Sequence, residues 1–231
     1  MTDKYFNIAV RCSKHNDFKI KAQENFQSKW NSEFTEFHHA RELIYCALVS
    51  LQYRFISKNE NLKPDKVDLT LTINSFFKGV ELTEIAIRQG FYAQANNLLK
   101  QEMETLCACI EIRKGKRKNK KTPNTQYLPY GLKSVYGHLN NVAHVSHDQS
   151  LKHINLAASG DNSHSASSSP QYNEKISKGL YGLHIVFMHE IALEMIQGYA
   201  ATIKASEIKE ELLILRKAFG LLKKLKILSS D

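Results

Sequence analysis

Apolar residues recur at intervals of three and four along most of this chain, which is the spacing of one face of an α-helix. The pattern is broken only where the four prolines and the polar stretches lie. The sequence therefore predicts an all-α fold, a multi-helix bundle of long amphipathic helices. The expected helices cover residues 31–58, 64–87, 92–113, 130–148, 173–204 and the chain from 206 onward.

The first 30 residues do not share this pattern. They are mixed and polar, and the alternation of Phe6, Ile8 and Val10 allows a short strand. The first regular helix is expected to begin between Asn31 and Thr35, since both residue types suit a helix N-cap. We therefore treat residues 1–30 as a separate N-terminal segment.

Two loops divide the rest of the chain. Residues 114–130 form a long polar loop, and the Ser-rich residues 156–170 are expected to be flexible. The bundle then covers residues 31–204, and residues 205–231 add a basic amphipathic helix as a C-terminal extension.

Two single residues and one long apolar segment predict details of the helices. Gly90 follows the second helix and indicates a bend or tight junction, and Ser206 is expected to cap the last helix. Residues 173–204 are apolar around most of their circumference, which is typical of a helix at the centre of a bundle.

The composition agrees with a packed protein of a reducing compartment. Of the 231 residues, 42% are hydrophobic. Cys46, Cys107 and Cys109 lie in apolar helical runs, where a free thiol packs as a small hydrophobe. The N-terminus lacks a secretory pattern, and no run of about 18 uncharged apolar residues exists. We therefore expect a cytoplasmic protein without a membrane span.

Positive charge is concentrated in one loop. The formal net charge is +9, and the run from residue 113 to 121 carries seven positive charges, so the rest of the chain has 9 − 7 = +2. Such a cluster either contacts the phosphates of a nucleic acid or keeps a loop solvated. The candidate nucleic-acid-binding residues are Arg113, Lys114, Lys116, Arg117, Lys118, Lys120 and Lys121.

Histidines near the end of the fourth helix are candidates for chemistry. His144 and His147 share a helix face with Asp148, and two imidazoles with a carboxylate form a weak alternative metal site. The competing interpretation is a polar helix end. His184 and His189 point about 140° apart on a helix, and we expect both at the edge of the core.

Lys100 and Glu104 form a charged pair one helical turn apart. Such a pair is usually a surface ion pair worth a few tenths of a kcal/mol. It becomes a functional candidate if it is buried and faces His144.

Two blocks resemble a family of prokaryotic helical domains. Its members read roughly G-x-x-x-x-A-x-x-L-L-R-x-x-x-E, followed later by Y-x-x-L-S-x-x-x-H. The matching residues are Gly90, Ala95, Leu98, Leu99 and Glu104, with Lys100 for the Arg, and then Tyr136, Leu139 and His144, with Asn140 for the Ser.

That family is similar in helical layout to the HEPN superfamily, many of whose members are dimeric ribonucleases of toxin–antitoxin and phage-defence systems. Their active sites carry R-N-x-x-x-H on a helix. Here Asn140 and His144 match, but Leu139 stands at the Arg position.

The resemblance implies a cytoplasmic, HEPN-like homodimer that binds RNA and has weak or no activity. Its protein partner would be an antitoxin or defence component. Cleavage would use no metal or cofactor: His144 would act as acid or base, Asn140 would orient the substrate, and Lys100 or Arg113 would neutralise phosphate. The alternative is a non-enzymatic interaction or dimerisation module with a solvated basic loop.

Overall fold

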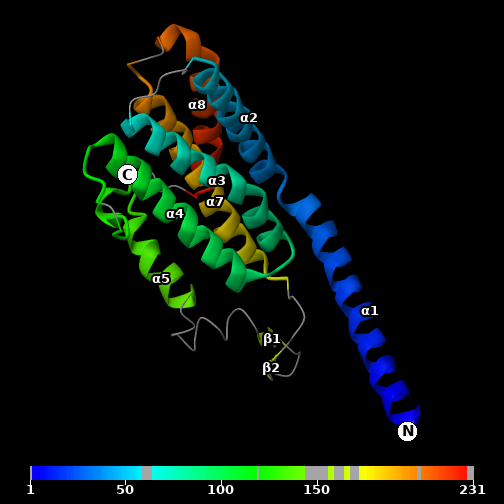
Figure 1. The fold of residues 1–231 in the computed structure, drawn as a ribbon. Coiled ribbons are helices and arrows are strands. Elements are labelled where there is room, and N and C mark those ends of the chain that lie inside the picture. The colour runs from blue at the N-terminus through cyan, green and yellow to red at the C-terminus, as the bar shows by residue number, and fades with distance from the viewer. Residues whose placement is uncertain are drawn as a thin grey trace.

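The computed structural model describes residues 2–58, 64–118, 120–143, 156–158, 164–166, 172–201 and 204–227. Long helices pack side by side over most of this length, and one helix extends well beyond them (Figure 1). The all-α bundle predicted from the sequence is confirmed.

The elements follow one another along the chain from α1 to α8. Their bounds are α1 (Thr2–Glu33), α2 (Thr35–Lys58), α3 (Pro64–Arg88), α4 (Tyr92–Arg113), η1 (Thr125–Tyr127), α5 (Lys133–Ala143), β1 (Leu156–Ala158), β2 (His164–Ala166), α7 (Glu174–Gly198), η2 (Ala205–Ile208) and α8 (Lys209–Lys224).

Helix α7 is the centre of the bundle, as its apolar circumference predicted. It packs against α2, α3, α4 and α8, and most of its side chains are buried. By length and composition α7 could cross a membrane, but 72% of its most apolar 18-residue window is buried inside the bundle. That burial is typical of the core helix of a soluble protein.

Local sequence signals set two of the helix boundaries. Gly90 has φ 73° and ends α3, with Phe91 N–H donating to Ala86 O and Gly90 N–H to Ile87 O. This is a Schellman motif, which glycine favours because it adopts positive φ without strain. At the start of α7, the Asn173 side chain accepts a hydrogen bond from Ile176 N–H. Both junctions were predicted.

The start of the last helix differs from the prediction. Residues Ala205–Ile208 form a 3₁₀ turn, and α8 begins at Lys209 without a side-chain cap. The expected cap by Ser206 is therefore wrong. Glu210 and Glu211 in the first turn of α8 still place negative charge at the positive end of the helix dipole.

The N-terminal segment is helical, so the expected strand at Phe6, Ile8 and Val10 is wrong. These residues belong to α1, which runs without interruption to Glu33. A strand needs a neighbouring strand for its backbone hydrogen bonds, and the strands β1 and β2 of the described chain pair only with each other. A helix satisfies its backbone internally, so α1 needs no such neighbour.

The structure also bears on the cysteines and on the Ser-rich stretch. Cys107 and Cys109 are buried as predicted, whereas Cys46 lies on the exposed side of α2, so its assignment as a core thiol is wrong. Within the Ser-rich stretch 156–170, the described residues are the two short antiparallel strands β1 and β2.

Candidate nucleic-acid interface

The basic loop after α4 is held in place by one buried carboxylate. Glu111, only 6% exposed, accepts a hydrogen bond from Arg117 Nη1 at 3.2 Å and another from Asn124 N–H at 2.8 Å. Arg117 Nη1 also donates to Lys121 O at 2.8 Å. These bonds close the loop on the end of α4, so its lysines are carried on a defined backbone.

The two arginines of the basic run 113–121, one at the end of α4 and one in the loop, form ion pairs with carboxylates of the protein. Arg113 donates from Nε and Nη2 to the two carboxylate oxygens of Glu194 on α7, at 2.6 and 2.9 Å. These hydrogen bonds raise the pKa of Arg113. Arg117 is likewise paired with Glu111. Both guanidinium groups therefore already form ion pairs with carboxylates of the bundle.

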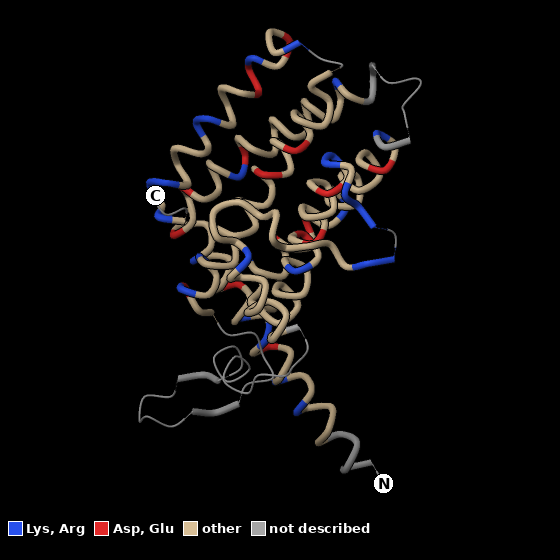
Figure 2. The backbone as a smooth tube through the Cα atoms, turned by 90° about the vertical axis from the view of Figure 1, so that its left-hand side faces the viewer, with Lys and Arg blue, Asp and Glu red and all other residues tan. Residues whose placement is uncertain are grey.

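The lysines of the loop, in contrast, are exposed. Figure 2 shows Lys and Arg residues gathered where the loop leaves α4. The Lys114 and Lys116 ammonium groups lie 4.9 and 5.5 Å from the centroid of the Tyr127 ring. The surface-exposed lysines of the loop are Lys114, Lys116, Lys118, Lys120 and Lys121.

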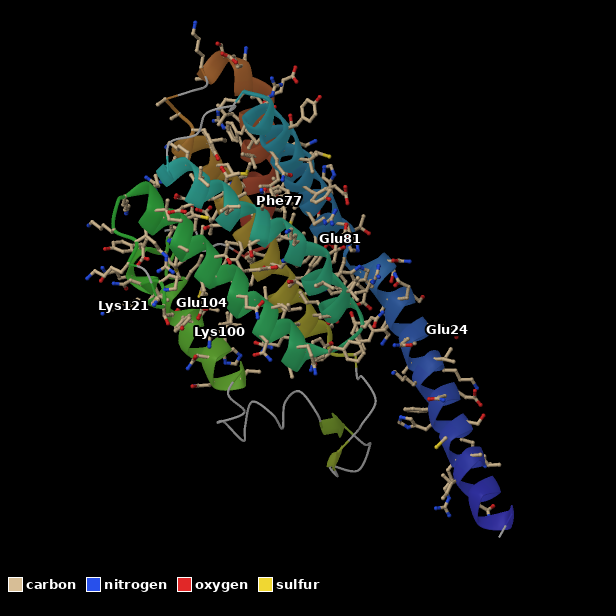
Figure 3. All side chains as sticks on the ribbon, in the orientation of Figure 1. Glu24, Phe77, Glu81, Lys100, Glu104 and Lys121 are labelled. Atoms are coloured by element: carbon tan, nitrogen blue, oxygen red, sulfur yellow. The ribbon has the colours of Figure 1, made fainter. Side chains whose placement is uncertain are left out.

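Helix α5 brings an unforeseen partner to Lys100 and Glu104. The Tyr136 hydroxyl donates to Glu104 Oε1 at 3.0 Å, and Lys100 Nζ lies 6.0 Å from the centroid of the same ring. Burial and the hydrogen bond to Glu104 raise the pKa of Tyr136, which keeps its hydroxyl protonated. Figure 3 shows Lys100 and Glu104 on the side of α4 that faces α5. We call these three residues the α4–α5 edge.

Of the motif on α5, the structure describes only part. Asn140 is half-buried and lies one helical turn after Tyr136, so it extends the α4–α5 edge. Leu139, at the position of the family's Arg, is 1% exposed and packs in the core. His144 lies outside the described residues, so its relation to Lys100 stays a prediction.

The weak metal alternative falls on the same undescribed stretch. His144, His147 and Asp148 all lie outside the described residues. Among the residues that are described, no group of three or more His, Cys, Asp or Glu side chains is placed to hold a metal ion.

His184 and His189 lie deeper than the core edge where they were expected. His184 is fully buried, and its Nδ1 lies 2.9 Å from Glu102 Oε2. His189 is 4% exposed, with Nδ1 2.9 Å from Glu190 Oε1. The carboxylate partner of His184 comes from another helix, so sequence spacing carried no signal for it.

A cavity of about 510 Å³ lies on another face of α5, between α4 and α7. Its wall is mainly apolar, with Val135 and Leu139 from α5 and Leu180 from α7. Asn96 also lines it; the Asn96 amide donates to Tyr92 O, while its Oδ1 is buried with no hydrogen-bond partner among the residues that the structure describes. Asn96 is a polar wall residue that the helical pattern did not single out.

Comparison of this chain with protein-family models, with curated proteins and with solved structures finds no match. Its geometry is therefore the basis for a functional assignment.

Proposed function

We propose that this protein binds single-stranded RNA through the lysines of the loop that follows α4. The observation that carries the proposal is the anchored loop itself, since Glu111 fixes a backbone that displays five exposed lysines. A defined set of ammonium groups can follow a phosphate backbone, and each contact releases counterions. Tyr127 adds an aromatic ring of the kind on which bases stack.

The α4–α5 edge would continue this surface. Lys100 supplies one more positive charge, and Tyr136 and Asn140 supply polar groups within reach of a strand that lies along α5. The resemblance described above adds a cytoplasmic defence or toxin–antitoxin setting with an antitoxin or defence component as partner. Cleavage is not part of the proposal, because Leu139 is buried in the core where a catalytic Arg would be needed.

The test is the salt-dependent affinity of the full chain for a short labelled RNA, measured by fluorescence anisotropy. The loop variant is Lys116→Gln/Lys118→Gln/Lys120→Gln. Its matched control, Lys209→Gln/Arg216→Gln/Lys217→Gln, removes the same charge from exposed positions of α8.

The wild type and the control should lose affinity steeply between about 50 and 200 mM salt. In the loop variant, the slope of log affinity against log salt should fall by about 2, because three phosphate contacts are lost at roughly 0.7 each. Equal losses in both variants, or no binding by the wild type, would overturn the proposal.

The same reactions resolved on a gel report on activity. Intact RNA throughout would assign binding alone, whereas fragments that disappear with His144→Ala would assign a metal-independent ribonuclease.

A further inference from the structure

The N-terminal part of α1 has no packing partner within the described chain. It extends away from the bundle in two perpendicular views (Figures 1 and 2). From Asn7 to Asn25 every side chain is exposed or half-buried, and the first buried residue is Phe26. Ile8, Phe18 and Ile20 are 53%, 57% and 53% exposed. We call residues 7–25 the arm. Most of the stability of a helix in a protein comes from packing one of its faces, so a surface that covered the arm would stabilise it.

A second apolar surface, which no described part of the chain covers, lies on α2 and α3. These helices run antiparallel and are joined by Gln52–Asn74 and Arg41–Glu84 hydrogen bonds. Phe77 and Glu81 lie on the side of α3 nearest α2 (Figure 3). We call this surface the α2–α3 face. Its exposed apolar side chains are Val49, Tyr53, Val67, Leu71, Leu82 and Ile85.

The arm and the α2–α3 face match in length and in charge. The apolar stripe from Val67 to Ile85 and the arm are both about 27 Å long, because each spans 18 residue steps of a helix. The arm has four basic residues against two acidic ones, which gives +2, and the face has four acidic residues against two basic ones, which gives −2. The arm's charged residues are Arg11, Lys14, Lys19, Lys21, Asp17 and Glu24, and those of the face are Glu42, Asp68, Glu81, Glu84, Arg41 and Lys78.

We propose that the α2–α3 face receives the arm of a second copy of this chain, so that two copies exchange arms in a closed dimer. The arm cannot reach its own face without breaking α1, which continues unbroken into Phe26 and Trp30, both anchored in the core. A two-fold axis makes each contact twice. Stable interfaces bury about 1,200–2,000 Å², so the two contacts of a closed dimer would together have to bury an area of that order.

Sedimentation velocity of the full chain tests this directly. The arm variant is Ile8→Glu/Phe18→Glu, two exposed side chains on the same side of α1, and the face variant is Leu82→Glu/Ile85→Glu. These side chains are exposed in the single chain, so both variants should fold, which circular dichroism and the fluorescence of the sole tryptophan, Trp30, would verify. The matched control, Leu212→Glu/Leu213→Glu, alters exposed leucines of α8.

The wild type and the control should be dimers, and each variant should dissociate about 100-fold more readily, because carboxylates would be buried in the contact. Mixing the arm variant with the face variant should restore dimers, since one of the two contacts is then intact. A monomeric wild type, or no recovery on mixing, would overturn the proposal.

Two native thiols identify what the arm touches. Cys12 lies on the arm and Cys46 on the exposed side of α2, and both are free and exposed. A flexible bismaleimide should yield a covalent dimer that is lost in Cys12→Ser and equally in Cys46→Ser. A dimer that survives Cys46→Ser would mean that arms pair with arms, and a link within one chain would mean that the arm folds back. Either result contradicts the proposal. The readout is separate from RNA binding, so the two proposals can fail independently.

Discussion

The Glu102 carboxylate on α4 lies 2.9 Å from Nδ1 of His184 on α7, and both side chains are buried in the core. Glu102 Oε1 also accepts the hydroxyl of buried Thr83 on α3, at 2.6 Å. One carboxylate thus connects three helices. His184 Nδ1 lies within hydrogen-bond distance of both Glu102 oxygens, whereas its Nε2 is buried without a hydrogen-bond partner among the described residues.

Removal of this carboxylate should destabilise the bundle. We expect Glu102→Ala to lower the free energy of unfolding by about 3 kcal/mol, since it removes the partner of buried His184 and leaves the Thr83 hydroxyl only Gly79 O, at 3.3 Å. Glu102→Gln keeps one acceptor oxygen and should cost only about 1 kcal/mol. Urea denaturation followed by circular dichroism measures both. Wild-type stability in the alanine variant would show that the contact contributes nothing.

A second buried carboxylate should make stability depend on acid. Burial alone would raise the pKa of Glu211, but hydrogen bonds from the Ser50 hydroxyl and Arg54 Nε, each 2.6 Å from Oε1, lower it overall from its ordinary 4.5. A lowered folded-state pKa means stability that is present above pH 4.5 and lost as the pH falls through the folded value.

Glu211→Gln should therefore be less stable than the wild type by about 2 kcal/mol at pH 7. The difference should shrink as the pH falls below 4.5, the ordinary value for this group. The control, Glu210→Gln, changes an exposed neighbour that contributes only through the helix dipole, so it should cost no more than about 0.3–1 kcal/mol at pH 7, clearly less than Glu211→Gln. Denaturation curves between about pH 3 and 7 decide the matter, and a difference that stays constant with pH would contradict the assignment.

The four cysteines should divide into two reactive and two protected thiols. Burial, with the nearby carboxylates of Glu111 and Glu104, raises the pKa of Cys107 to about 12, and burial also raises the pKa of Cys109. Cys12 and Cys46 are exposed. A thiolate is the reactive form, so alkylation of the native protein at pH 8 should label only Cys12 and Cys46. Mass spectrometry before and after denaturation counts the labels; rapid native labelling of Cys107 would be inconsistent with its burial.

The anchoring of the basic loop should control its susceptibility to proteolysis. In Glu111→Ala the bonds to Arg117 and Asn124 N–H are lost, so the loop should open more often and trypsin should cut within residues 114–121 roughly ten-fold faster. Gln126→Ala, an exposed change in the following turn, should leave the rate unaltered. Equal rates in the two variants would show that Glu111 does not hold the loop.

The sequence by itself determined the long helices from α2 onward and the central position of α7. Apolar spacing is repeated many times within one helix, and the signals at Gly90 and Asn173 act on their own neighbouring backbone. Such information is local, and it survives without knowledge of the fold. Where the local signal was short, as at Ile8 or Ser206, it misled, because the backbone continued the hydrogen-bonded turns of the neighbouring helical segment.

Only the tertiary structure decided which charged side chains form buried pairs and which remain exposed to solvent. Arg113 and Glu194 are 81 residues apart, and Glu102 and His184 are 82 apart. No spacing rule connects such pairs, since their meeting depends on how α4 lies against α7. The same packing left the loop lysines and the arm exposed while burying Leu139 and Phe26. Which charged side chains pair and which surfaces are buried depends on how two helices pack against each other. The sequence of one segment does not contain that information.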